Sequence, residues 1–145
     1  MKTVIKLSVF IAALTILLIS ACEPVEDPTD GDPRDAYVGE WNFVEKVSLK
    51  STEDQYFVVT ISKDASNSSQ VIINNFGGLS SDGVIVKAVI TSGQAVIPLL
   101  NMNGWIVEGS GDLVSANKKS MTWDYYITGG GDRIHYIATA TKKGV

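Results

Sequence analysis

The chain has 145 residues, with 16 acidic and 12 basic side chains, a formal net charge of −4 and a single cysteine. One cysteine excludes an intramolecular disulfide, and the length fits one domain. From residue 36 onward acidic and basic residues nearly balance, which argues against a basic nucleic-acid surface, so we expect no nucleic-acid partner.

A short apolar segment opens the chain. Lys2 and Lys6 supply a basic start, and an apolar run follows over Leu7–Ile19, which is the layout of a signal peptide. A permanent transmembrane helix is the alternative, but the run is shorter than the roughly 20 residues that span a bilayer. We therefore predict that residues 1–21 are a signal peptide.

The residues at the end of this segment, Ile19-Ser20-Ala21-Cys22, resemble a bacterial lipobox. The resemblance implies that Cys22 becomes the new N-terminus and carries a diacylglycerol and an N-acyl chain. Two or more acyl chains anchor a protein stably, whereas one chain gives only marginal membrane binding. Lipidation also explains a lone cysteine in an exported chain. We expect the membrane to be a partner through this anchor.

Residues 22–35 are predicted to be the acylated cysteine and an acidic, proline-rich tether. The segment has almost no apolar surface to offset the entropy of ordering, and proline and like charges extend it. A calcium site at Asp30, Asp32 and Asp35 is the alternative, but no full ligand loop follows, and we expect no metal. Acids directly after Cys22 resemble the export signals of surface lipoproteins in Bacteroidetes. This implies an outer-membrane protein that faces the cell exterior, with the periplasmic face as the alternative.

Residues 36–145 form short β-rich runs separated by turns rich in Gly, Asp, Asn and Ser. No segment with a helical apolar period interrupts them. Strands joined by short connections in series favour an all-β, antiparallel up-and-down barrel, which has room for side chains or one small ligand. Few residues remain for a lid. The eight predicted strands are Tyr37–Leu49, Gln55–Lys63, Gln70–Phe76, Val84–Thr91, Gln94–Leu99, Gly104–Val114, Ser120–Thr128 and Arg133–Thr141.

Alternation within the strands predicts which side chains face the interior. Pro98 cannot donate to a ladder, so it marks a bulge or an opening. Gly109-x-Gly111 leads into a strand rather than a helix, so we interpret it as part of a turn or bulge and not as a phosphate site. The predicted inward residues include Tyr37, Trp41, Phe43, Val47, Leu49, Phe57, Val59, Ile61, Val84, Val86, Ala88, Ile90, Met121, Trp123, Tyr125 and Ile127.

Glu45 is the exception to this alternation, because its parity matches that of Trp41 and Phe43. An inward carboxylate could orient the polar or cationic head of a ligand in an apolar cavity. Alternatively, Glu45 lies at the rim, or a bulge turns it outward. The aromatic residues leave a similar choice between core packing and a stacking platform for a ligand. These residues are Trp105, Trp123, Tyr125, Tyr126 and Tyr136.

The triplet Gly39-x-Trp41, at the start of the first strand, resembles the signature of lipocalins and related calycin barrels. The resemblance implies that Trp41 plugs the closed end of the barrel and that Lys142 or Lys143, at the end of the last strand, stacks across it. Further segments extend the resemblance to the small lipocalin-like lipoproteins of Bacteroidetes. They are Ala95–Pro98, Glu108–Leu113 and Ser120–Tyr126.

This resemblance implies a surface-anchored monomer that binds a small hydrophobic or amphipathic ligand without a cofactor. We expect an apolar cleft near Ala88 and Ala138/Ala140. A protein-interaction module with a filled barrel, such as an inhibitor or a carbohydrate-binding accessory subunit, is the alternative. Catalysis is not expected, because lipidation leaves no thiol and the only histidine, His135, lies on an Ala- and Thr-rich strand. The expected ligand contacts are Phe43, Glu45, Phe57, Ala88, Met121, Trp123 and Tyr125.

Overall fold

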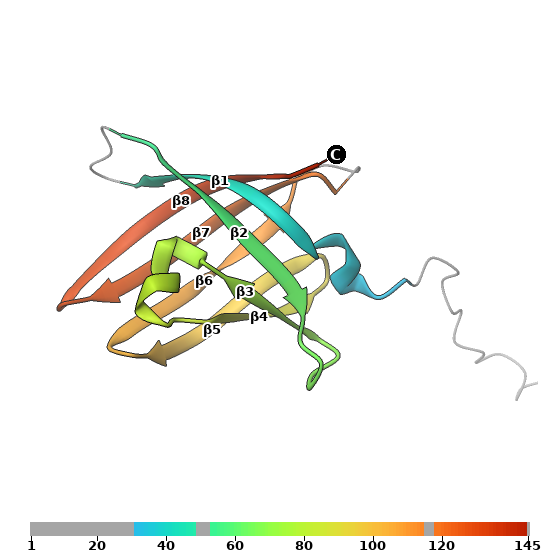
Figure 1. The fold of residues 1–145 in the computed structure, drawn as a ribbon, viewed down its shortest axis with the longest axis horizontal. Helices are drawn as coiled ribbons and strands as arrows, with labels where there is room; N and C mark the ends of the chain where they lie inside the picture. The colour runs from blue at the N-terminus through green and yellow to red at the C-terminus, as the bar shows by residue number, and fades with distance from the viewer. Residues whose placement is uncertain (1–30, 49–52, 115–117, 145) are drawn as a thin grey trace, which may run out of the picture. The chain divides into compact units, whose positions relative to one another are not determined.

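The computed structural model describes residues 31–48, 53–114 and 118–144, and these form an all-β barrel of eight antiparallel strands (Figure 1). Each strand pairs with the next one along the chain, and β8 pairs with β1 to close the barrel. The prediction of an eight-stranded antiparallel barrel is therefore confirmed. The strands are β1 (Gly39–Val47), β2 (Gln55–Lys63), β3 (Gln70–Asn74), β4 (Val86–Thr91), β5 (Gln94–Met102), β6 (Trp105–Leu113), β7 (Ser120–Gly129) and β8 (Asp132–Lys142).

The barrel forms because alternate residues of its strands are apolar and successive side chains of a strand point to opposite faces. In β1, Trp41 and Phe43 are buried while Glu40 and Asn42 are exposed. The same alternation holds in β7, where Trp123 is buried. Most of the predicted inward set is thus confirmed as core. The buried members are Tyr37, Trp41, Phe43, Val59, Ile61, Val84, Val86, Ala88, Ile90, Met121, Trp123, Tyr125 and Ile127, whereas Val47 and Phe57 are only partly buried and Leu49 lies outside the described residues.

The connection between β3 and β4 differs most from the prediction. Phe76 was expected to end a strand and residues 77–83 to be a turn, but Phe76–Asp82 form a 3-10 segment, η2. The cause is local, because Asn75, Gly77 and Gly78 have left-handed backbone angles, with φ values of 64°, 59° and 71°, that a strand cannot contain. The segment buries Phe76 and Leu79.

The predicted irregularity at Pro98 is confirmed, because the register between β5 and β6 shifts between Ile97 and Leu100. The strand continues beyond the shift to Met102 rather than ending at Leu99 as predicted. A bulge accommodates Pro98, which has no N–H to contribute to the ladder, without ending the strand.

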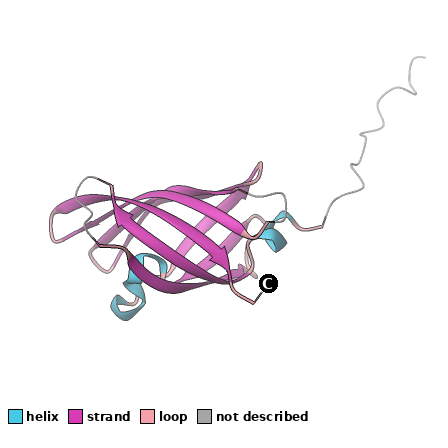
Figure 2. Cartoon of the chain, turned by 90° about the horizontal axis from the view of Figure 1, so that it is seen from above, coloured by secondary structure: helices cyan, strands magenta, loops and turns pink. Residues whose placement is uncertain are grey.

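A second 3-10 segment, η1 (Pro33–Ala36), precedes β1. The two segments lie at opposite ends of the barrel, η1 as the blue coil and η2 as the lime-green coil in Figure 1, and both are cyan in Figure 2. We call the two ends of the barrel the η1 end and the η2 end. The hairpins that join β5 to β6 and β7 to β8 lie at the η2 end.

Residues 32–35 were assigned to the tether, but the structure places them in the folded unit. The Arg34 side chain donates Nη1 hydrogen bonds to three carbonyl oxygens of the β2–β3 connection, and its Nη2 lies 2.7 Å from the Asp32 carboxylate. These acceptors are the carbonyls of Asp64, Asn67 and Gln70 at 3.1, 2.9 and 3.3 Å. The composition of the segment did not predict this docking, because a single arginine, Arg34, makes most of the contacts. The predicted signal peptide, Cys22 and the tether as far as Asp30 lie outside the described residues.

Asp32 and Asp35, two members of the alternative calcium site, both pair with Lys63, at 2.9 and 2.6 Å. Hydrogen bonds from Arg34 and Lys63 hold the pKa of Asp32 well below its usual range. These carboxylates therefore contact cationic side chains. Across the ranges that the structure covers, no group of three or more His, Cys, Asp or Glu side chains could hold a metal ion.

Candidate functional site

At the η1 end, the structure brings together Gly39, Trp41 and Lys142. Trp41 is fully buried, and its Nε1 donates a 2.7 Å hydrogen bond to the carbonyl oxygen of Tyr37. The Nζ of Lys142 lies 5.4 Å from the centre of the Trp41 ring, within the range of a cation–π interaction. Lys143, the other candidate for this role, pairs instead with Glu40 at 2.9 Å.

Inside the barrel, four of the predicted ligand contacts belong to one group of packed aromatic rings. The ring centres of Phe43 and Phe57 are 5.5 Å apart, and those of Phe43 and Trp123 are 6.1 Å apart. Phe76 of η2, which sequence reasoning placed at a strand end, joins them at 5.1 Å from Trp123 and 4.5 Å from Tyr125. Ring pairs at these separations pack favourably. These five residues, which we call the aromatic cluster, link β1, β2 and β7 to η2.

The other predicted contacts, Ala88 and Met121, are buried in the wall on β4 and β7. On β8, Ala138 pairs with Trp123 and Ala140 with Met121. Because alanine is small, the larger side chains of the neighbouring strands can lean over β8, as the contact between Trp123 and Phe43 shows. The apolar cleft expected beside these alanines stays a prediction.

Glu45 is inside the barrel and is 5% exposed. Its Oε2 accepts a hydrogen bond from the hydroxyl of Tyr125, and burial raises the pKa of its carboxyl to about 7. The alternatives that Glu45 lies at the rim or is turned outward by a bulge are therefore wrong. Within the described residues Glu45 has no salt bridge. The site thus holds a buried carboxyl group without a cationic partner.

Tyr136 of β8 extends the polar part of the site. Its ring stacks on that of Tyr125, with centres 5.5 Å apart and planes 18° apart. Burial and the charge of Glu45 raise the pKa of the Tyr136 hydroxyl. Glu45, Tyr125 and Tyr136 therefore form one polar group within the apolar barrel, which we call the Glu45 cluster.

Trp123 carries a second unusual polar atom. Its Nε1 is buried and has no hydrogen-bond partner among the described residues, although buried donors normally have one. The ring lies against Gly111 of β6, where a Cβ atom would come within 2.4 Å of it. Gly109 and Gly111 are thus mid-strand positions facing Tyr125 and Trp123, so they do not form a turn, although Gly109 adjoins the register shift between β5 and β6.

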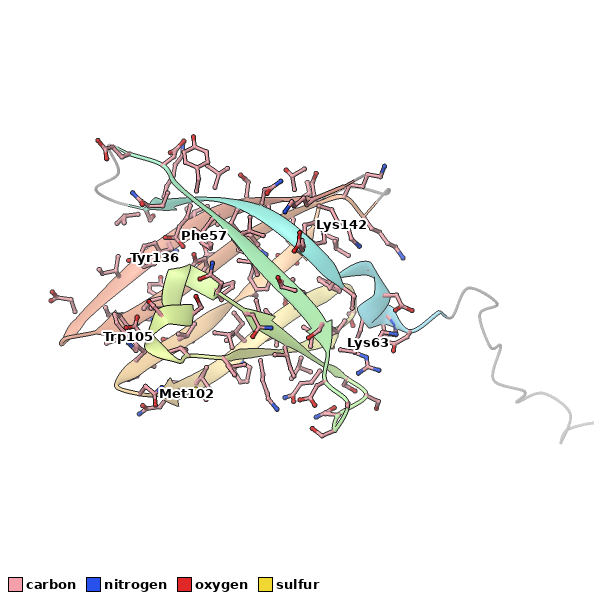
Figure 3. The ribbon with its side chains drawn as sticks, in the orientation of Figure 1. Phe57, Lys63, Met102, Trp105, Tyr136 and Lys142 are labelled. Atoms are coloured by element: carbon pink, nitrogen blue, oxygen red, sulfur yellow. The ribbon has the colours of Figure 1, made fainter. Side chains whose placement is uncertain are left out.

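Partly exposed apolar side chains lie toward the η2 end. Phe57, Trp105 and Tyr136 are half-buried and pack against the core. Figure 3 shows these three, together with Met102, in the half of the barrel that carries η2, whereas Lys63 and Lys142 lie toward the η1 end. The four side chains come from β2, β5, β6 and β8. We call them the rim.

His135 lies on the outer face of β8. Its Nε2 is 2.9 Å from the Asp124 carboxylate, and its ring stacks on that of Tyr126 with centres 4.5 Å apart. The guanidinium of Arg133 lies 3.6 Å from the centre of the same Tyr126 ring. His135 and Tyr126 thus lie on the opposite face of the barrel wall from the Glu45 cluster.

No protein-family model matches this chain, and no curated protein is significantly similar to it. Among the residues described, no helix is long and apolar enough to cross a membrane.

Proposed function

We propose that the protein is a membrane-anchored lipoprotein whose lipocalin-like barrel binds a small hydrophobic or amphipathic ligand through the η2 end. The lipobox-like residues ending at Cys22 support the anchor. The arrangement of Gly39, Trp41 and Lys142 supports the lipocalin-like character of the barrel. Outward display at the cell surface rests on the acidic residues that follow Cys22.

The buried carboxyl group of Glu45 is the observation that carries the binding proposal. An ionisable group in an apolar interior costs stability unless it is paired, and here its partner is the Tyr125 hydroxyl. Perturbed carboxyl groups of this kind concentrate at functional sites. Ligand sites commonly combine an apolar wall with a few converging polar groups, and the aromatic cluster and the Glu45 cluster provide both.

Titration with fluorescent fatty-acid and sterol-like probes tests this proposal. The full chain with Cys22→Ser, which cannot be lipidated, should bind at least one probe with a Kd in the micromolar range, about −8 kcal/mol. Phe57→Ala at the rim should weaken binding, whereas Tyr56→Ala should not, because Tyr56 is the neighbouring residue on the outer face and is 74% exposed. Absence of binding to every probe would contradict the proposal.

The anchor is tested separately by fractionation. Cys22→Ser should abolish the incorporation of labelled fatty acid and release the mature-length protein from membranes. If the trimmed Cys22→Ser protein stays on the membrane, the anchor lies elsewhere. Digestion of intact cells by an external protease distinguishes display at the cell exterior from display at the periplasmic face.

A protein-interaction module is the second candidate, and the outer face of the barrel favours it. Tyr56 and Val58 of β2 are 74% and 40% exposed, and Ile137 of β8 is 45% exposed. Both strands pair with β1, so these apolar side chains share one side of the barrel. Under this alternative, a partner protein should cross-link to the parent protein in cells but not to the variant that combines Tyr56→Lys and Ile137→Lys. No small probe should bind.

A further inference from the structure

We infer that the ligand carries a cationic amine head group, which binds the carboxylate of Glu45 beside the stacked rings of Tyr125 and Tyr136. This inference rests on the proposed function, because it names the chemical class of ligand that the same site would take. It goes beyond a general hydrophobic ligand by assigning the charge of the head group.

Glu45 has unmet hydrogen-bonding capacity among the described residues. An ionised carboxylate accepts up to about four hydrogen bonds, and among the described residues Glu45 has one donor, the Tyr125 hydroxyl. Tyr125 is neutral, so it offers no compensating charge. An ammonium group supplies both a positive charge and further N–H donors. An alcohol supplies a donor without the charge, and a carboxylate head group would be repelled.

Aromatic side chains surround the carboxyl group of Glu45. The faces of tyrosine and phenylalanine rings attract cations, most strongly where the cation is desolvated. Tyr125 and Tyr136 are stacked with centres 5.5 Å apart, and Phe57, partly exposed, lies on β2 beside β1. A carboxylate next to several ring faces is complementary to an amine that carries an apolar body.

Charges near the η2 end favour the approach of a cation. Among the described residues, the nearby cations Lys46 and Arg133 are already paired, with Asp54 at 3.4 Å and Glu108 at 2.9 Å. An excess of acidic groups around a site raises the local concentration of cationic ligands. Besides the partners of these two cations, Asp82 at the end of η2 and Asp132 at the start of β8 add negative charge at this end.

Protonation of Glu45 should make the affinity for a cationic amine depend on pH. Because burial raises its carboxyl pKa to about 7, a large fraction of the free protein holds a proton there at neutral pH. A cationic amine binds the ionised form, so binding should release that proton. Affinity should rise about tenfold between pH 6 and pH 8, since the ionised fraction rises by about that factor across a pKa near 7.

Calorimetric titration with three ligands of equal chain length tests the inference. Octylamine, octanol and octanoate differ only in the head group, and an alkylamine is protonated at pH 8 because its pKa is near that of lysine, about 10.4. The full chain with Cys22→Ser should bind octylamine at least tenfold more tightly than octanol, with octanoate the weakest. Titrations in buffers of different ionisation enthalpy at pH 6.5 should show proton release for octylamine alone.

Glu45→Gln should lower the affinity for octylamine at least tenfold and change that for octanol less than twofold. Glu40→Gln is the matched control, because Glu40 lies on the same strand but faces outward and pairs with Lys143. If Glu45→Gln does not fold, Tyr125→Phe keeps the carboxylate and should retain the preference for the amine. The pH dependence of octylamine binding needs no variant of the site.

The outcomes separate this inference from the proposed function. Equal affinity for octylamine and octanol, or tightest binding of octanoate, overturns the inference and leaves a ligand-binding barrel. Amine binding that survives Glu45→Gln, or that is lost with Glu40→Gln, places the amine outside the barrel and also overturns it. Failure of all three ligands and of the fluorescent probes contradicts both proposals.

Discussion

Lys142 reaches Trp41 by crossing over Gly39. Its Nζ lies 5.4 Å from the centre of the indole ring, and a Cβ atom at position 39 would come within 3.1 Å of the Lys142 Cε. Gly39 also has a φ of 132°, which side-chain-bearing residues rarely adopt. Glycine two residues before the tryptophan therefore gives the lysine stem its path across the β1–β8 seam.

Trp41→Ala should destabilise the barrel by about 3–5 kcal/mol, the usual cost of removing a large aromatic side chain from a core. Trp41 is 0% exposed, and the substitution also removes the indole donor to the Tyr37 carbonyl. Asn42→Ala, at the adjacent outward position, is the control and should change the free energy of unfolding much less. Similar losses for the two variants in urea melts would mean that the facing of β1 is wrong.

Gly111→Ala should destabilise the barrel by about 1–3 kcal/mol, as overpacking of a core commonly does. The added Cβ would lie 2.4 Å from a carbon of the Trp123 ring, so the ring must move and the near-ultraviolet circular dichroism should change. Gly31→Ala is the control, because nothing lies within 4 Å of its added Cβ. An unchanged spectrum and melting curve for Gly111→Ala would show that Trp123 does not rest on this glycine.

Arg34→Lys should loosen η1 while the strands stay protected. The guanidinium donates to three carbonyls of the β2–β3 connection and to Asp32, and an ammonium cannot reproduce that planar set of donors. Hydrogen exchange should become faster at the amides of Asp35 and Tyr37, which η1 bonds protect. Lys46→Ala is the control at an exposed ion pair. If the amides of Asp35 and Tyr37 are as well protected in Arg34→Lys as in the parent, Arg34 does not hold η1 in place.

Alternation and turn residues were sufficient to predict most of the barrel. The β2 boundaries were predicted to the residue, and the inward parity of Trp41, Phe43 and Glu45 agrees with their burial. The predictions succeeded because each strand has one apolar face, so a shift of one residue would expose that whole face. The bulge at Pro98 was predictable because its cause is local chemistry.

Two features depend on contacts distant in the chain and could not be predicted from local pattern. Phe76 reads as the end of an apolar strand, and only the position of Trp123 and Tyr125 shows that it packs inward from η2. The sequence around Gly111 does not identify Trp123 as its neighbour. Only the β6–β7 register places the two residues opposite each other. Local signals existed for η2, since Asn75 and Gly77-Gly78 favour left-handed backbone, but they do not reveal what such a segment covers.

Stability of the unliganded barrel should fall as pH rises from about 4.5 to 7, because of Glu45. Its folded pKa, about 7, is above the ordinary value of 4.5, so the folded state holds the proton more tightly than the unfolded state. The contribution of this group is therefore most favourable below pH 4.5 and is lost as pH passes through 7, by about 3 kcal/mol in total. Desolvation of the carboxylate is the physical cause.

Glu45→Gln removes this dependence, because the amide does not ionise and its oxygen can still accept a hydrogen bond from Tyr125. The variant should therefore be more stable than the parent at pH 8 by up to about 3 kcal/mol, with a difference that shrinks toward pH 5. Urea melts of both proteins from pH 5 to pH 8 measure this difference directly, since other titrating groups are common to the two. Glu40→Gln changes an exposed ion pair, so its free energy of unfolding should depend on pH in the same way as that of the parent. Parallel curves for Glu45→Gln as well would show that the carboxyl group is solvated rather than buried.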